Sequence, residues 1–406
     1  MSKRLSLIKE HSSILIMALG AGSLFLLNIF LKNVLTSSDF GYYCLLITYL
    51  AMINSFGLMG VEQTVIRKCE VNEIEGKVYI NRSLKYLSLL SIVGILFISF
   101  LSFYLDIFER FWMHVFSTLF IAVTMYCYNI LRLLKKYHLS QIVLNFWRIM
   151  MLGIGTIVYL SNIVMDYKSL SIIIFILICF SGVFSLFLLF KYLRINYTSV
   201  TKIDYDDVRL TFYFLITLVS GAVISQGDKI FFDYYFSIEL LGEYTYYSML
   251  FLYPFSFLQN YLGFKFLVDF KLSKNSHKLK KSNLKILTFI SIGFTLLVLA
   301  LNVLIYMFFD NNNFNYPLLI SLLLLTGNVK LFYSLYSSII GVKSSNQILK
   351  RMNILFLVVL ILVFGVVFYI KPNSVEFVAF LFLFLWVLRI FIWGYYSKTI
   401  LSKKIN

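Results

Sequence analysis

The chain has 406 residues, of which 60% are hydrophobic and 14% are charged, and its formal net charge is +17. Its mean hydropathy is +0.85. A soluble domain averages about 45–50% apolar and about 25% charged residues. The composition therefore excludes a soluble fold and predicts an integral membrane protein. The excess of positive charge is interpreted as a topology signal, and no nucleic-acid partner is expected.

A membrane-spanning helix needs about 20 mainly apolar residues, and runs of this kind recur along the chain. In order, they are 12–31, 40–61, 86–105, 111–131, 149–165, 169–190, 210–227, 244–264, 286–309, 311–329, 352–370 and 375–397. The fifth is expected to begin near Ile142, the seventh to continue to Phe232 and the tenth to Ile340. The first run lacks a cleavage site and is read as a retained helix. The predicted fold class is an all-α integral membrane protein with about twelve transmembrane helices.

Lys and Arg residues concentrate in alternate connections, with 28 on the side that holds both termini and 4 on the other. Cytoplasmic loops carry such an excess, so both termini are predicted to be cytoplasmic. The external connections are short; they fall near 32–39, 106–110, 162–168, 233–243, 310–316 and 371–376. A membrane polysaccharide polymerase usually has a sizeable external catalytic loop. The short loops therefore argue against an enzyme of this kind.

The chain repeats itself weakly at half its length. Residues 36–43 (TSSDFGYY) and 237–244 (SIELLGEY) each follow an odd-numbered span, and each has Gly followed two residues later by Tyr. Both halves would have six helices and the same orientation, as in transporters built from parallel repeats. The predicted domains are an N-terminal bundle over 1–195, a cytoplasmic linker over 196–209 and a C-terminal bundle over 210–406.

Two segments resemble a known family. Residues 34–60 are similar to the first external turn and second helix of the polysaccharide flippases, and residues 226–262 to their seventh-to-eighth helix region. The second similarity consists of Asp228 with Lys229, the Leu241-Gly-Glu-Tyr244 turn and Pro254. These proteins belong to the multidrug/oligosaccharidyl-lipid/polysaccharide exporter superfamily. The nearest group is the lipid-linked O-antigen flippases of Gram-negative bacteria.

The resemblance implies two six-helix bundles around a central cavity in a bacterial inner membrane. The cargo would be an undecaprenyl-diphosphate-linked oligosaccharide, whose head group crosses through the cavity while its lipid tail stays in the bilayer. No bond is made or broken and no cofactor is expected. Besides this cargo and membrane lipids, a polysaccharide polymerase or chain-length protein is a candidate partner. The basic segment 265–285 could bind such a protein, or anionic lipid head groups.

Ionisable residues inside membrane spans are costly and are therefore functional candidates. Four of them are basic: Arg148, Lys229, Lys330 and Arg389. At about 1.5 Å of rise per residue, Lys330 and Arg389 lie about 20 Å along their helices, and Arg148 lies nearer an end. Arg can grip a phosphate with a planar fork and Lys with a point charge. We predict that Arg148, Lys330 and Arg389 line the cavity and bind the phosphates, with Lys229 at the outer exit.

Each of these positions also has a structural interpretation. The side chains of Arg148 and Arg389 could instead snorkel to the inner interface. Asp228 is a candidate for ion coupling, although adjacent residues on a helix point in different directions, so Asp228 and Lys229 could each pair with another helix. Glu62 is interpreted as an interfacial cap.

Other functions of the same fold stay open. A multidrug exporter moves organic cations and would favour unpaired acids in the core of the N-terminal half, where the sequence offers Glu62 near an edge. A teichoic-acid or exopolysaccharide exporter is not separated from an O-antigen flippase by sequence. No GxxxxGK[ST] stretch supports ATP hydrolysis by this chain. The scattered Cys and His residues predict neither a disulfide framework nor a metal site.

Overall fold

The computed structural model of the chain describes residues 2–72, 74–103, 107–161, 163, 165–195, 204–272, 276–308 and 315–402. It divides into two compact units, Met1–Gln226 and Gly227–Asn406, called unit 1 and unit 2 below. The division falls inside one helix, so the chain passes from one unit to the other without leaving helical geometry. Of the predicted linker 196–209, residues 196–203 lie outside the described part, and residues 205–209 form the first turn of that helix.

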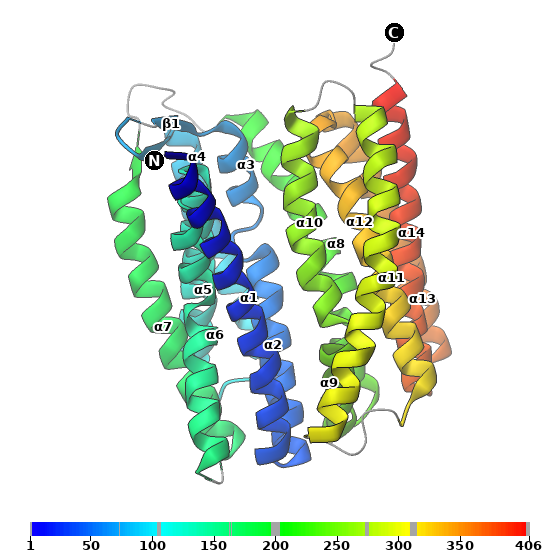
Figure 1. The fold of residues 1–406 in the computed structure, drawn as a ribbon. Coiled ribbons are helices and arrows are strands. Elements are labelled where there is room, and N and C mark those ends of the chain that lie inside the picture. The colour runs from blue at the N-terminus through cyan, green and yellow to red at the C-terminus, as the bar shows by residue number, and fades with distance from the viewer. Residues whose placement is uncertain are drawn as a thin grey trace. The chain divides into compact units, whose positions relative to one another are not determined.

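Unit 1 is a bundle of long helices with one short helix at its end (Figure 1). Its helices are α1 (Ser2–Val34), α2 (Ser37–Phe56), α3 (Val61–Lys68), α4 (Arg82–Phe103), α5 (Phe111–Leu133), α6 (Tyr137–Leu160), α7 (Tyr167–Tyr192) and the first two-thirds of α8 (Tyr205–Tyr235). The helix α1 packs chiefly along α6, and α5 along α7. At the α5–α7 face, the Ser185 hydroxyl donates to that of Thr124 and Gly182 lies against Phe120; small or polar residues of this kind let apolar helices approach closely.

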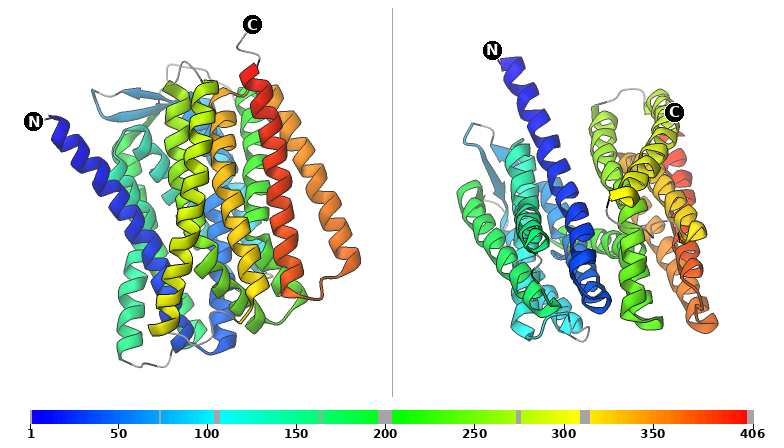
Figure 2. Two further views of the ribbon diagram at one scale, coloured as in Figure 1. Left: turned by 45° about the vertical axis from the view of Figure 1, so that its right-hand side comes forward. Right: turned by 60° about the horizontal axis from the view of Figure 1, so that its bottom comes forward.

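Unit 2 begins with the end of α8 and continues with six helices. These are α9 (Ile238–Phe251), α10 (Tyr253–Leu272), α11 (Ser276–Phe308), α12 (Pro317–Lys343), α13 (Asn346–Ile370) and α14 (Val375–Ser402). The helix α12 packs along both α10 and α14 and is the central element of the unit (Figure 2). Residues on α12 therefore reach side chains from most other helices of the unit.

The helices confirm the predicted fold class. Ten helices of the described chain are long and apolar enough to cross a membrane, and a shorter apolar stretch, Ala18–Val34, lies in α1. The predicted span 244–264 appears as α9 and α10, which brings the arrangement to about twelve crossings. The predicted extensions also hold, because α6 starts before Ile142 and α8 and α12 run past Phe232 and Ile340. Together the length and apolarity of these helices make the chain a multi-pass membrane protein.

The helices begin with short polar caps. The side chain of Thr36 accepts the Asp39 N–H before α2, and that of Ser237 accepts the Leu240 N–H before α9. These bonds satisfy backbone donors that a helix start leaves free. The two caps occupy matching positions in the half-length sequence repeat. At the start of α7, hydrogen bonds from the Ser169 side chain and backbone hold the pKa of Asp166 below its usual range.

The boundary between α9 and α10 has a specific cause. Pro254 lies at the second position of α10 and has no N–H to donate to Leu250, four residues earlier. The Leu250 carbonyl is satisfied instead by the side-chain amide of Asn302 on α11, at 3.1 Å. In hydrocarbon, an unsatisfied carbonyl would cost several kcal/mol. The proline therefore breaks the span, and Asn302 makes the break tolerable.

A small sheet at one end of unit 1 was not predicted from the sequence. Strands β1 (Glu70–Asn72) and β2 (Lys77–Ile80) form an antiparallel hairpin, and β3 (Leu193–Ile195) pairs in parallel with β2. Val78 pairs with Leu193, so the loop after α3 is joined to the chain that leaves α7. Three- and four-residue strands give almost no periodic signal, which explains why the sequence did not reveal them.

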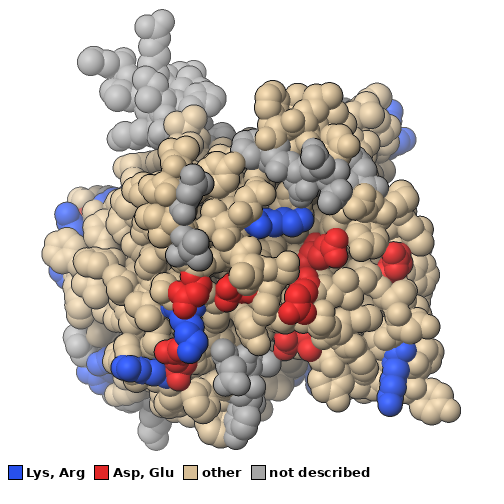
Figure 3. All heavy atoms as spheres, turned by 90° about the horizontal axis from the view of Figure 1, so that it is seen from below, with Lys and Arg blue, Asp and Glu red and all other residues tan. Residues whose placement is uncertain are grey.

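Seen from below, the helix ends form a largely uncharged surface on which groups of Asp and Glu and scattered Lys and Arg side chains stand out (Figure 3). In unit 1 this end holds an exposed ion pair between Lys168 and Glu109, with a distance of 2.8 Å between Nζ and Oε1. The pattern agrees with the low Lys and Arg content of the connections predicted to be external.

Candidate functional site

Unit 2 contains four of the five predicted site residues. Asp228 and Lys229 lie on α8, Lys330 on α12 and Arg389 on α14, and each is less than a tenth exposed. The fifth, Arg148, lies on α6 in unit 1. The structure thus places four of the predicted charges in one unit and Arg148 in the other.

Asp228 and Lys229 pair with each other. The Lys229 Nζ lies 3.3 Å from Oδ1 of Asp228, and Oδ2 accepts a 2.8 Å hydrogen bond from the Tyr244 hydroxyl of α9. The expectation that the two side chains point apart is wrong, because the flexible lysine stem folds back onto its neighbour. Tyr244 belongs to the repeated segment 237–244, which the structure places in the cap and first turns of α9; the predicted turn at Leu241–Tyr244 is therefore wrong. The repeated tyrosine serves as the partner of a buried carboxylate.

Lys330 lies beside this pair without a carboxylate of its own among the described residues. Its Nζ donates a 3.1 Å hydrogen bond to the Ser256 hydroxyl and lies 5.1 Å from the centre of the Trp386 ring. It is close enough to Asp228 and Lys229 for their charges to interact with it. One carboxylate thus faces two ammonium groups, and the cluster keeps a net positive charge.

Arg389 is enclosed by aromatic rings. Its guanidinium carbon lies 4.8 Å from the centre of the Tyr333 ring, 5.2 Å from Phe356, 5.7 Å from Trp386 and 4.7 Å from Trp393. The side chain is buried, and its Nε has no hydrogen-bond partner in the described structure. The expectation that Arg389 could snorkel to an interface therefore does not describe this arrangement; the rings take the place of water.

The sequence contained a local signal for these four rings. Trp386, Arg389 and Trp393 recur at spacings of three and four residues, which places them on one face of α14. Lys330 and Tyr333 are likewise three residues apart on α12. Only the packing of α12 and α13 against α14 adds the other two rings, so the complete enclosure could not be read from one segment.

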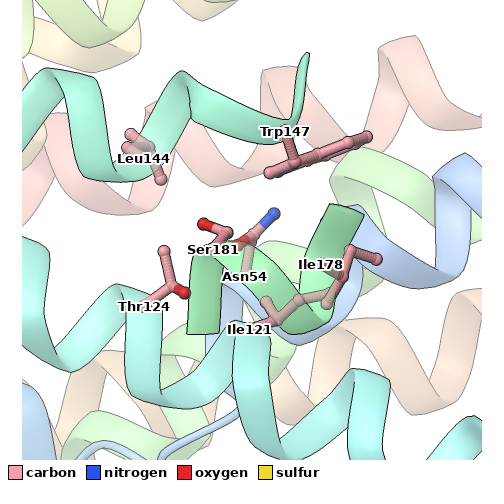
Figure 4. A pocket seen from close by; sticks show the side chains of 7 residues that line it. All are labelled: Asn54, Ile121, Thr124, Leu144, Trp147, Ile178 and Ser181. Carbon is pink, nitrogen blue, oxygen red and sulfur yellow. The ribbon is translucent and has the colours of Figure 1, made fainter. Parts of the chain in front are cut away.

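Arg148 has a different environment. It is half-buried, donates a 3.2 Å hydrogen bond to Oδ1 of Asn145, and lies 5.5 Å from the centre of the Trp147 ring. Trp147 also lines a small cavity with Leu144 on the same helix, and Ile121 and Thr124 of α5 lie on the opposite side (Figure 4). Asn54, Ile178 and Ser181 complete the lining. This cavity has a volume of about 10 Å³, the space of one water molecule, and none of its lining residues is charged.

Glu62 is the residue that the sequence interpretation undervalued. It lies on α3, is only 6% exposed, and its Oε2 has no hydrogen-bond partner among the described residues. It packs beside the cluster of Val61, Val65 and Tyr126 rather than capping an exposed interface. The sequence signal was the glycine pair at 57 and 60, which ends α2 and redirects the chain so that Glu62 points inward.

Unit 1 also joins α3 to the start of α8 through a polar contact that we call the α3–α8 latch. In it, Lys68 forms an ion pair with the buried Asp207, and its Nζ lies 3.7 Å from Oδ2 of Asp204. One turn away, the hydroxyls of Thr64 and Thr211 are 2.8 Å apart. The latch explains why the first part of α8 belongs to unit 1.

Neither cysteine chemistry nor a metal centre is indicated in the described residues. None of the four cysteines, all of them in the described part of the chain, forms a disulfide, and burial raises the pKa of the Cys69 thiol, which lies outside the spans, to about 11. No group of three or more His, Cys, Asp or Glu residues comes together within the described part of the chain.

The sequence matches no family model and no curated protein. The structure, however, is similar to a crystal structure of MATE in complex with Br-NRF, with a TM-score of 0.55 and 12% sequence identity. The similarity covers 98% of this chain and 96% of that one. The chain therefore has a MATE-like, all-helical fold along nearly its whole length.

Proposed function

We propose that the chain is a secondary transporter of the multidrug/oligosaccharidyl-lipid/polysaccharide exporter superfamily, that it works by alternating access, and that it exports an organic cation. The observation that carries this proposal is the MATE-like fold over 98% of the chain. A transporter needs no catalytic loop, and this agrees with the short connections between the helices. The membrane is proposed to be a bacterial inner membrane.

Glu62 supports a cationic cargo or a coupling cation. It is a buried carboxylate in unit 1 with one oxygen unpartnered among the described residues, and a cation exporter would favour such an acid in this half. A buried carboxylate can exchange a proton or a sodium ion for a cationic cargo, because one positive charge replaces another at the same group.

A second candidate function rests on unit 2. Its buried charges are mainly basic, which favours an anionic cargo such as an undecaprenyl-diphosphate-linked oligosaccharide. In this flippase, Arg148, Lys229, Lys330 and Arg389 would bind the diphosphate, and Asp228 would take part in ion coupling. A polymerase or chain-length protein would then be a partner at the membrane surface.

Reconstituted vesicles separate the two functions. The full chain is placed in liposomes, and the accumulation of ethidium is followed under an imposed proton or sodium gradient. We expect gradient-dependent accumulation that is lost in Glu62→Gln and kept in Glu109→Gln, a matched change at an exposed acid of the same unit. Ethidium transport absent under every gradient, together with translocation of a lipid-linked oligosaccharide to the opposite leaflet, would replace the first candidate with the second.

A further inference from the structure

Arg389 has an unusual set of partners for a buried charge. Its side chain is 3% exposed, it lies in the middle of α14, and no carboxylate of the described chain is within ion-pair distance. A buried cation normally needs an opposite charge to offset its lost hydration. Here four aromatic faces at 4.7–5.7 Å fill that role.

The four rings form one continuous enclosure, which we call the aromatic cage. It consists of Tyr333 on α12, Phe356 on α13, and Trp386 and Trp393 on α14. The centre of the Tyr333 ring lies 5.3 Å from that of Trp386 and 5.8 Å from that of Trp393, and the ring centres of Phe356 and Trp393 are 5.6 Å apart. Because each ring supports its neighbour, the cage depends on helix packing as well as on the arginine.

Such an enclosure has a defined chemical preference. A ring face attracts a cation through its quadrupole, most strongly for a weakly hydrated cation such as guanidinium or a quaternary ammonium. Several aromatic rings around one cation are the arrangement that proteins use to recognise choline and methylated lysine. The cage therefore selects charge and size.

We propose that the aromatic cage of unit 2 is a binding site for an organic cation and that Arg389 is its tethered occupant, which the cation displaces. This inference rests on the proposed export of an organic cation and names the site and cargo class. When cargo enters, one cation replaces another, so the net charge of the buried cage is unchanged. Lys330, on the same Trp386 ring, disfavours a second cation unless Arg389 leaves.

The contrast with Arg148 indicates that the cage is a specific arrangement. Arg148 also lies against a tryptophan, but only Trp147 faces it, and the Asn145 amide oxygen accepts its hydrogen bond. Removing Arg148 would leave one ring and a polar group. Removing Arg389 would leave four rings around a space that fitted a guanidinium.

The test measures choline binding to the purified full chain in lipid nanodiscs through tryptophan fluorescence, because two of the four tryptophans belong to the cage. Arg389→Ala empties the cage and is expected to bind choline at least about tenfold more tightly than the unchanged chain. The uncharged isostere 3,3-dimethylbutan-1-ol should show no such gain. Arg148→Ala is the matched control and should gain nothing, and Trp393→Leu added to Arg389→Ala should abolish the gain.

Should Arg389→Ala fail to fold, Arg389→Gln removes the charge but keeps most of the side chain, and the same gain is expected. Equal choline affinity in the unchanged chain and the folded Arg389 variant would overturn the proposal, as would an equal gain for the isostere. Binding of inorganic pyrophosphate to the unchanged chain but not to the Arg389 variant would also overturn the proposal, because it would show that Arg389 binds an anion. If the Arg389 variant gains choline affinity but the chain does not transport ethidium, the cage binds organic cations and the proposed export function is wrong. If the chain transports ethidium but the variant gains no choline affinity, the export function stands and the proposal for the cage is wrong.

Discussion

The two units stabilise buried charge in different ways. In unit 1, the buried Asp207 is paired near one end of the unit, where Lys68 bridges to it and to Asp204. Unit 2 keeps its charges in the middle of helices, where Asp228 neutralises one lysine and aromatic rings surround an arginine. The difference shows that ionisable residues in hydrophobic runs can have different structural roles. The role of each depends on the partners that other helices supply.

The largest expected effect is at the buried pair of unit 2. Asp228→Ala would leave Lys229 buried without its carboxylate and Tyr244 without its acceptor, and should lower the free energy of unfolding by about 3–5 kcal/mol. Thermal unfolding of the purified protein measures this change. Because the loss comes from an orphaned charge, the double variant Asp228→Asn with Lys229→Met should recover most of it; a double variant as unstable as Asp228→Ala would contradict the explanation.

The next effect is at the turn that positions the α3–α8 latch. Gly60 has a φ of +82°, and an added Cβ would lie 2.7 Å from the Leu215 nitrogen and 2.8 Å from the Thr211 oxygen. Gly60→Ala should therefore destabilise unit 1 by about 2 kcal/mol or more, through left-handed strain and backbone contact together. Gly76→Ala is the control, since its φ is +64° but its surroundings are open. Equal losses in thermal stability for the two variants would show that the close approach to α8 has no energetic role.

A smaller change of opposite sign is expected at Lys330. Its ammonium has a hydroxyl and a ring for partners, but the adjacent Asp228 is already paired with Lys229. Lys330→Met keeps the volume and removes a poorly compensated charge, so it should stabilise the protein by about 1 kcal/mol. Transport should fall in the same variant if the lysine serves the cargo. A lower unfolding temperature for Lys330→Met would mean that the charge itself stabilises unit 2.

The smallest effect is at the exposed ion pair of unit 1. Lys168 and Glu109 lie 2.8 Å apart, but both side chains are largely in water. Solvent and salt screen such a pair, so Lys168→Met should leave the unfolding temperature unchanged within error. The contrast with Asp228→Ala then isolates the contribution of burial, because both variants remove one member of an ion pair. A clear loss of stability for Lys168→Met would remove that contrast.

Much of the candidate site was predictable because each charged residue interrupts an apolar run. Lys229, Lys330, Arg389 and Asp228 were found in this way, and the structure buries all of them. The interpretation of Glu62 as an interfacial cap was wrong. Glu62 lies between a predicted span and a basic segment, and the sequence did not reveal the turn at Gly57 and Gly60 that directs it inward. The phosphate-binding role of the four cations stays a prediction.

The sequence by itself determined that the chain resides in a membrane, that it crosses about twelve times and where its spans lie. These properties follow from the hydropathy of consecutive residues, which does not depend on distant contacts. Only the tertiary structure decided that Pro254 divides a span with the help of Asn302, that β2 pairs with β3, and that four rings from three helices enclose Arg389. Each of these features joins residues far apart in the chain, so it contributes to the free energy of folding only once the helices have packed.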